Sequence, residues 1–177
     1  MKYKFTKNYI KKYPNVIPSE LCDSIITQPD LKFYPATTGG GKRSVARNCY
    51  IKKLEEKFND EISKIFLHVF KLYIKEFRFF DSMKLESSGY DVLYMGSQSQ
   101  EYKDHVDHSQ FNKPRILTCS LILNDNYTGG DFRFFEGEYR VPKKAGSAVV
   151  FPSNFCFPHA ISPVSEGDRH AIITWIY

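Results

Sequence analysis

The chain has 177 residues, and a hydrophobic content of 42% with 15 Phe and 12 Tyr indicates one packed globular domain and excludes a disordered chain. The formal net charge of +5 is spread over N-terminal lysines and a helical segment, which argues against the clustered basic face of a nucleic-acid-binding protein. No apolar stretch could span a bilayer and the four cysteines form no Cys-x-x-Cys pair, so we expect a cytoplasmic protein without membrane attachment.

Two helices are predicted in the N-terminal half. Residues 18–27 predict a short helix capped by Ser19, with Glu20 in its first turn. Residues 54–77 carry apolar side chains three or four positions apart, which predicts a long amphipathic helix. Between them, residues 35–47 combine three glycines with Lys42 and Arg43, a composition that favours a mobile flap.

Short β-rich runs separated by turn residues dominate the chain after about residue 89. They span residues 90–95, 102–107, 116–123, 132–135, 147–151 and 171–177. This spacing of short strands predicts an α+β, mainly β fold: a double-stranded β-helix, or jelly roll, with N-terminal supporting helices. We expect one domain over residues 1–177, with helical support over about 1–80 and a β core over about 86–177.

A metal-binding pattern lies in the β-rich half. His105 and Asp107 are two residues apart on a predicted strand and therefore point to the same face. Together with His159 from a distant strand, they provide two imidazoles and one carboxylate, the ligand set of non-heme Fe(II) oxygenases, which leaves positions open for a co-substrate and dioxygen. The neighbouring His108 could be mistaken for a ligand, and His68 on the long helix is expected to pack or lie at the surface.

An ordered series of motifs accompanies these ligands. It comprises residues 115–118, 121–124, 129–132, 142–146, 150–152, 163–164 and 169–175. Over roughly residues 86–177, this series resembles the prolyl 4-hydroxylase-like branch of the Fe(II) and 2-oxoglutarate-dependent dioxygenases. The resemblance implies that His105, Asp107 and His159 are the catalytic iron ligands.

The same resemblance implies roles for residues around the metal. Arg169 would hold the distal carboxylate of 2-oxoglutarate, since the planar guanidinium fork can donate two parallel hydrogen bonds to a carboxylate. Tyr94 would assist in binding 2-oxoglutarate, and Trp175 would line the pocket. Tyr102, Arg115 and Arg43 would contact the substrate. Strand alternation adds Leu121, Leu123 and Ile173 to the expected barrel lining.

The implied enzyme is a dioxygenase that hydroxylates an unactivated C–H bond, foremost by prolyl 4-hydroxylation of a peptide or protein, and releases succinate and CO2. Its cofactors would be Fe(II), 2-oxoglutarate and O2, with ascorbate as a reductant. A free amino acid, a small metabolite or a nucleobase remains an alternative substrate. A non-catalytic cupin-like metal-binding module remains an alternative of another class, although the chain has only five histidines. A zinc hydrolase could use the same ligands, but no His-Glu-x-x-His motif is present.

Overall fold

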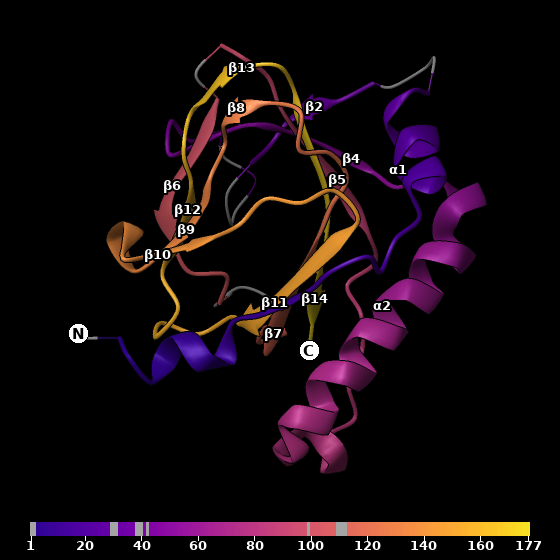
Figure 1. The fold of residues 1–177 in the computed structure, drawn as a ribbon, viewed down its shortest axis with the longest axis vertical. Helices are drawn as coiled ribbons and strands as arrows, with labels where there is room; N and C mark the ends of the chain where they lie inside the picture. Colours follow the sequence, from indigo (N-terminus) through magenta and orange to yellow (C-terminus); the bar gives the residue numbers. More distant parts are fainter. Residues whose placement is uncertain (1–2, 29–31, 38–40, 42, 99, 109–112) are drawn as a thin grey trace.

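The computed structural model describes residues 3–28, 32–37, 41, 43–98, 100–108 and 113–177. Its architecture consists of two antiparallel sheets that face each other, with the long helix across the outer face of the larger sheet (Figure 1). The prediction of an α+β, mainly β jelly roll is confirmed. None of the helices in the described part of the chain is long and apolar enough to cross a membrane.

The major sheet has the strand order β1-β11-β7-β14-β5-β4-β2, and the minor sheet has the order β10-β9-β12-β6-β3. The major sheet contains β1 (Lys11–Tyr13), β2 (Tyr34–Pro35), β4 (Tyr50–Lys53), β5 (Asp91–Met95), β7 (Leu117–Ile122), β11 (Ser147–Pro152) and β14 (Arg169–Ile176). The minor sheet contains β3 (Arg47–Asn48), β6 (Glu101–His105), β9 (Phe132–Phe134), β10 (Tyr139–Val141) and β12 (His159–Ile161). A third pair joins β8 (Thr128–Gly129) to β13 (Val164–Glu166), and the helices are η1 (Thr6–Tyr9), α1 (Ser19–Ile26), α2 (Glu56–Glu76), η2 (Arg78–Ser82) and η3 (Phe135–Gly137).

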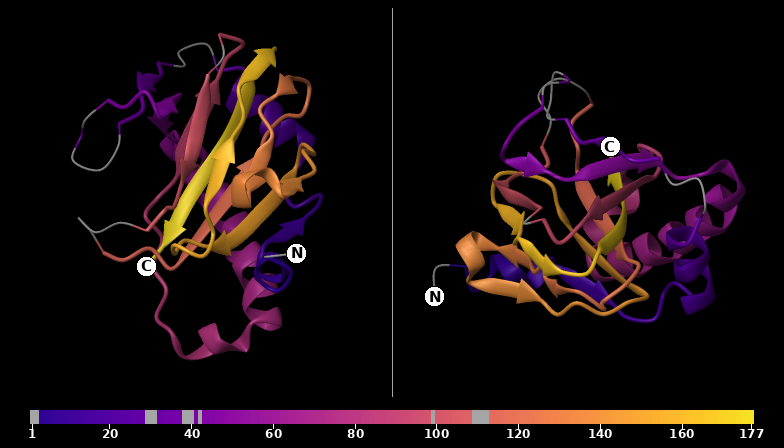
Figure 2. Two further views of the ribbon diagram at one scale, coloured as in Figure 1. Left: turned by 90° about the vertical axis from the view of Figure 1, so that its left-hand side faces the viewer. Right: turned by 90° about the horizontal axis from the view of Figure 1, so that it is seen from above.

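Both predicted α-helices are present and close to their expected bounds. The predicted cap of α1 is wrong, because Pro18 occupies the N-cap position and Ser19 is the first helical residue. Pro18 has extended backbone angles and makes no side-chain capping bond. Along α2, apolar side chains at helical spacing form one buried face, and this face packs against the major sheet (Figure 2).

Alternation along the strands divides the apolar residues between two cores. On the outer face of the major sheet, Leu121 and Ile172 belong to the core beneath the helices. On the inner face, Met95 and Ile122 pack with side chains of the minor sheet. The predicted barrel lining is therefore wrong for Leu121 and Leu123, which both belong to the helix-side core. The cause is register, since neighbouring strand residues point to opposite faces.

The first 80 residues also provide strands that the sequence did not predict. β1 pairs with β11 at one edge of the major sheet, while β4 and β2 extend the sheet beyond β5. β3 pairs with β6 at the edge of the minor sheet. These strands have two to four residues, too short for a periodic pattern to identify them. Of the predicted flap, residues 38–40 and 42 lie outside the described residues.

Candidate active site

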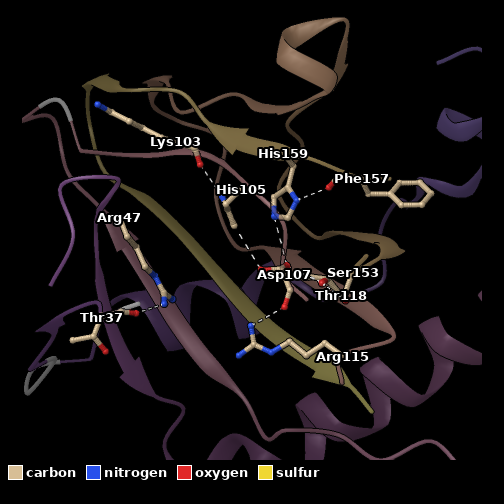
Figure 3. Close-up of polar contacts among 10 residues, drawn as sticks. All are labelled: Thr37, Arg47, Lys103, His105, Asp107, Arg115, Thr118, Ser153, Phe157 and His159. Carbon is tan, nitrogen blue, oxygen red and sulfur yellow. Dashed lines mark hydrogen bonds and ion pairs between the residues drawn. The ribbon is translucent and has the colours of Figure 1, made fainter. Parts of the chain in front are cut away.

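The three predicted metal ligands converge between the sheets. His105 ends β6 and lies directly across the antiparallel ladder from His159, the first residue of β12. Asp107 follows β6 by two residues and is 5% exposed. One ligand atom from each side chain lies within 4.8 Å of the others, and Figure 3 shows the three groups turned toward one another. The arrangement has the size and donor types of a two-histidine, one-carboxylate metal site.

Backbone carbonyls orient both imidazoles. His105 Nδ1 lies 2.7 Å from the carbonyl oxygen of Lys103, and His159 Nδ1 lies 3.1 Å from that of Phe157 (Figure 3). A carbonyl can only accept, so each Nδ1 carries a proton, and in a neutral ring Nε2 then presents its lone pair. Both Nε2 atoms face Asp107, at 3.7 Å for His105 and 3.5 Å for His159. The imidazoles are thus oriented for metal binding.

The Asp107 carboxylate is fixed by buried hydroxyl groups. Thr118 Oγ1 donates a hydrogen bond to Asp107 Oδ2 at 2.7 Å. Thr118 Oγ1 also lies 2.8 Å from Ser153 Oγ, which must donate because the Thr118 proton is already used. The ladder between β7 and β11 brings Thr118 next to the end of β11, close to Ser153. Arg115 Nη1 donates to the Asp107 carbonyl oxygen at 3.2 Å.

The protonation states at this site suit a cation. Burial, followed by the neighbouring His159, lowers the pKa of His105 well below its ordinary value, so the ring is neutral near pH 7. Burial alone would raise the pKa of Asp107, but the two imidazoles and the Thr118 hydroxyl outweigh burial and lower it. Neutral imidazoles and an ionised carboxylate are the forms that bind metal.

Aromatic rings and guanidinium groups flank the three ligands. The ring of Tyr102 stacks on His105 with centroids 3.4 Å apart, and the Arg47 guanidinium lies 5.2 Å from the Tyr102 centroid. Arg47 donates to the carbonyl oxygen of Thr37 (Figure 3). The Arg115 guanidinium lies 3.7 Å from the centroid of Trp175. Predicted residues Tyr102, Arg115 and Trp175 therefore border the ligands or their immediate partners.

A bulge explains how Tyr102 reaches the site. On β12, His159 and Ile161 are two residues apart, whereas their partners on β6, His105 and Tyr102, are three apart. The extra residue in β6 is a β-bulge, which turns both partners toward the same side of the sheet.

Arg169 lies inside the barrel with unused donors. The residue is 3% exposed, and its Nε and Nη1 have no hydrogen-bond partner within the described residues. It begins β14 and pairs across the ladder with Met95, whose side chain belongs to the inner core. A buried guanidinium without an acceptor is costly, so these donors call for an anionic ligand. The predicted position of Arg169 in the pocket agrees with this geometry.

Two predicted site residues are elsewhere. Tyr94 pairs with His170, one position away from the pair of Met95 with Arg169, and so lies on the opposite face of the sheet. Its hydroxyl donates to Asp168 Oδ1 at 3.0 Å, which makes its predicted contact with 2-oxoglutarate wrong. Arg43 is exposed and forms an isolated β-bridge with Thr37 in the loop. Among the contacts of the described residues, none joins Arg43 to the ligand cluster.

Comparisons with known proteins agree with this geometry. Residues 90–177 match the family described as the 2OG-Fe(II) oxygenase superfamily. A PKHD-type hydroxylase of Alteromonas mediterranea is 37% identical over 91 residues, which cover 45% of this chain and 39% of that protein. Another from Prochlorococcus marinus is 24% identical over 145 residues, covering 78% of this chain and 63% of its own length. The chain thus spans less than two thirds of these relatives.

Two solved structures share the fold. One is a prolyl hydroxylase from Trichoplax adhaerens in complex with a hypoxia inducible factor peptide fragment, with a TM-score of 0.77, 18% identity and coverage of 99% of this chain and 86% of that one. The other is a viral collagen prolyl hydroxylase of Paramecium Bursaria Chlorella virus-1, with a TM-score of 0.69, 19% identity and 95% coverage of both chains. Residues 90–177, which contain all three ligands of the cluster, belong to the 2OG-Fe(II) oxygenase superfamily.

Proposed function

We propose that the protein is an Fe(II)- and 2-oxoglutarate-dependent dioxygenase that hydroxylates a prolyl residue of a peptide or protein. One observation carries the proposal: a two-histidine, one-carboxylate cluster and a buried arginine with unused donors lie inside the same barrel. The cluster would hold Fe(II), and Arg169 would hold the distal carboxylate of 2-oxoglutarate. We include in the proposal a single domain over residues 1–177 and a cytoplasmic location, which suits four free cysteines.

Bound Fe(II) would supply the activation of O2, coupled to decarboxylation of 2-oxoglutarate to succinate and CO2, with ascorbate keeping the metal reduced. The residues of the chain perform the remaining work. Thr118 holds the Asp107 carboxylate, and the carbonyls of Lys103 and Phe157 hold the imidazoles. The buried apolar side chains of the inner core would limit the access of water to bound Fe(II).

The peptide substrate is supported by the surroundings of the ligands. Tyr102 and Arg115 provide an aromatic surface and a guanidinium next to the metal site, groups that suit the ring and the carbonyl oxygens of a prolyl peptide. Among the structural neighbours, the Trichoplax adhaerens enzyme was solved with a peptide fragment bound.

Incubation with Fe(II), 2-oxoglutarate, ascorbate and a library of proline-containing peptides tests the proposal. We expect succinate release coupled to peptides that gain one oxygen atom at proline, and no turnover by His159→Ala. If a free amino acid or a nucleobase gains the oxygen while every peptide stays unchanged, the substrate proposal is wrong. If the protein folds and binds metal but releases no succinate with any substrate class, the proposed activity is wrong and the protein is a non-catalytic metal-binding module.

A further inference from the structure

Arg47, a residue without a predicted role, lies next to the aromatic side of the site. It begins β3 and pairs across the ladder with Tyr102 of β6, so the two side chains lie on the same face of the minor sheet. The bulge in β6 turns His105 to that face as well. One short edge strand thus places a guanidinium beside the candidate metal site.

The Tyr102 ring has two partners. It stacks on the His105 imidazole, with centroids 3.4 Å apart and an angle of 15° between the planes. The Arg47 Cζ atom lies 5.2 Å from the centroid of the same ring, a cation–π contact. Among the described residues, no hydrogen bond restrains the Tyr102 hydroxyl. The position of the ring therefore depends on packing and on these two contacts.

Charge distinguishes the two contacts. Burial raises the pKa of Tyr102 to about 12, so the phenol is neutral near pH 7 and Arg47 contacts the ring and not a phenolate. Burial, followed by His159, lowers the pKa of His105, so the imidazole is neutral too. Arg47 is therefore the cation of this group of three side chains.

Backbone contacts hold Arg47 beside the ring. Its Nη1 donates to the carbonyl oxygen of Thr37 (Figure 3). The amide nitrogen of Lys103, the residue after Tyr102, donates to the carbonyl oxygen of Ala46 at 2.8 Å. Arg47 is half-buried, and its Nε has no hydrogen-bond partner within the described residues. Partial burial strengthens a cation–π contact, because the cation has lost part of its hydration.

We propose that Arg47 is a positioning residue of the active site, whose guanidinium holds the Tyr102 ring against the His105 imidazole. The ring in this position forms a wall against which the prolyl ring of a peptide packs. This second step rests on the proposed function, since it assumes a peptide substrate, whereas the position of the ring does not depend on it.

Histidine NMR of the metal-free protein reports the stack directly and needs no turnover. The chain has five histidines, so a protein labelled with 13C at histidine Cε1 gives a simple spectrum, and His105→Gln assigns one resonance. The ring current of a stacked aromatic side chain displaces the His105 Hε1 resonance. Tyr102→Leu, which removes the ring, gives the position of this resonance without the stack.

Three substitutions of arginine test the positioning role. Arg47→Met removes the cation at similar length, Arg47→Lys restores it, and Arg140→Met is the matched control, since Arg140 is paired with Asp131 on β10. We expect the His105 resonance of Arg47→Met to move most of the way to its position in Tyr102→Leu, that of Arg47→Lys to stay closer to the wild type, and that of Arg140→Met to be unchanged. The remaining histidine resonances show that each variant is folded. A wild-type resonance in Arg47→Met, or an equal displacement in Arg47→Lys, would overturn the inference.

Fluorescence anisotropy with a labelled proline-containing peptide, in the presence of Mn(II) and 2-oxoglutarate, tests the second step. Loss of a partly buried cation–π contact predicts about fivefold weaker peptide binding by Arg47→Met, and Arg140→Met should bind as the wild type does. A displaced His105 resonance with wild-type peptide affinity would overturn the role of the ring as a substrate wall. If the wild type binds no proline-containing peptide, the proposed substrate is wrong, while the His105 resonance still decides whether Arg47 positions Tyr102.

Discussion

The hydroxyl of Thr118 offers a sharp test of how the Asp107 ligand is prepared for metal. Thr118→Val keeps the shape of a side chain that is fully buried and removes the 2.7 Å hydrogen bond to Asp107 Oδ2. This hydrogen bond orients the carboxylate, and we expect its effect on metal affinity to come from that orientation. Removal of such outer partners usually weakens metal binding by about 10- to 100-fold. We expect a loss of about tenfold, because Arg115 still holds the Asp107 backbone.

The same substitution should also lower the stability of the metal-free protein. It leaves the Ser153 hydroxyl, in a side chain 1% exposed, without its acceptor and deprives a buried carboxylate of a donor. Each unsatisfied buried group costs about 1–3 kcal/mol of unfolding free energy.

Anaerobic calorimetry with Mn(II) measures the affinity, and urea denaturation measures the stability. Thr118→Ser is the matched control, since it retains the hydroxyl and should bind Mn(II) within about twofold of the wild type, a much smaller change than removal of the hydroxyl should cause. If Thr118→Val folds and binds Mn(II) as tightly as the wild type does, the hydroxyl does not prepare the ligand and the reasoning is refuted.

Three further substitutions examine other parts of the account. Arg115→Met removes a cation–π contact with Trp175 and the hydrogen bond to the Asp107 carbonyl, so calorimetry should show weaker Mn(II) binding as well as any loss of peptide turnover; an effect on peptide alone would mean that Arg115 does not support the ligand. Leu121→Ala should cost about 2–5 kcal/mol of unfolding free energy, because it opens a cavity under α2. The Kd of 2-oxoglutarate should stay unchanged, because the side chain faces the helices; an altered Kd would mean that Leu121 lines the barrel. Burial lowers the pKa of His170 below 6.5, so the unfolded chain binds more protons as pH falls below that value, and the stability present above it is lost. Urea denaturation of the metal-free protein at about pH 7.5 and about pH 5.5 should show this loss of unfolding free energy. The loss should be smaller in His170→Gln than in the wild type, and it should equal that of the wild type in the control His68→Gln, on the exposed face of α2. A loss in His170→Gln equal to that of the wild type would exclude this histidine as a source.

Sequence reasoning predicted the residues of the candidate metal site because their geometry is local or strongly patterned. His105 and Asp107 share a face through simple strand alternation, and His159 followed from the order of the surrounding motifs. Tyr102 and His105 are three residues apart and would be assigned to opposite faces by alternation alone. Only the bulge in β6 brings both of them to the site, and a bulge has no strong signal in a single sequence.

Tyr94 and the residues that support the Asp107 ligand show the limit of that reasoning. A shift of one residue along β5 decides whether Tyr94 or Met95 faces Arg169, and only the pairing with β14 fixes this register. Thr118 and Ser153 meet through the β7 and β11 ladder, and Arg115 reaches the Asp107 carbonyl oxygen. These contacts join residues far apart in the sequence, so neither periodicity nor spacing could predict them.

The central claim is that one barrel holds both a metal site and a site for a 2-oxo dicarboxylic acid. The most direct measurement is an anaerobic titration of the purified protein with Fe(II) and then 2-oxoglutarate, recorded as the weak visible charge-transfer band that accompanies chelation of the 2-oxo acid. We predict that the band appears in the wild type, is lost in His159→Ala and needs more 2-oxoglutarate in Arg169→Met. Bound Fe(II) without any band at saturating 2-oxoglutarate would contradict the account.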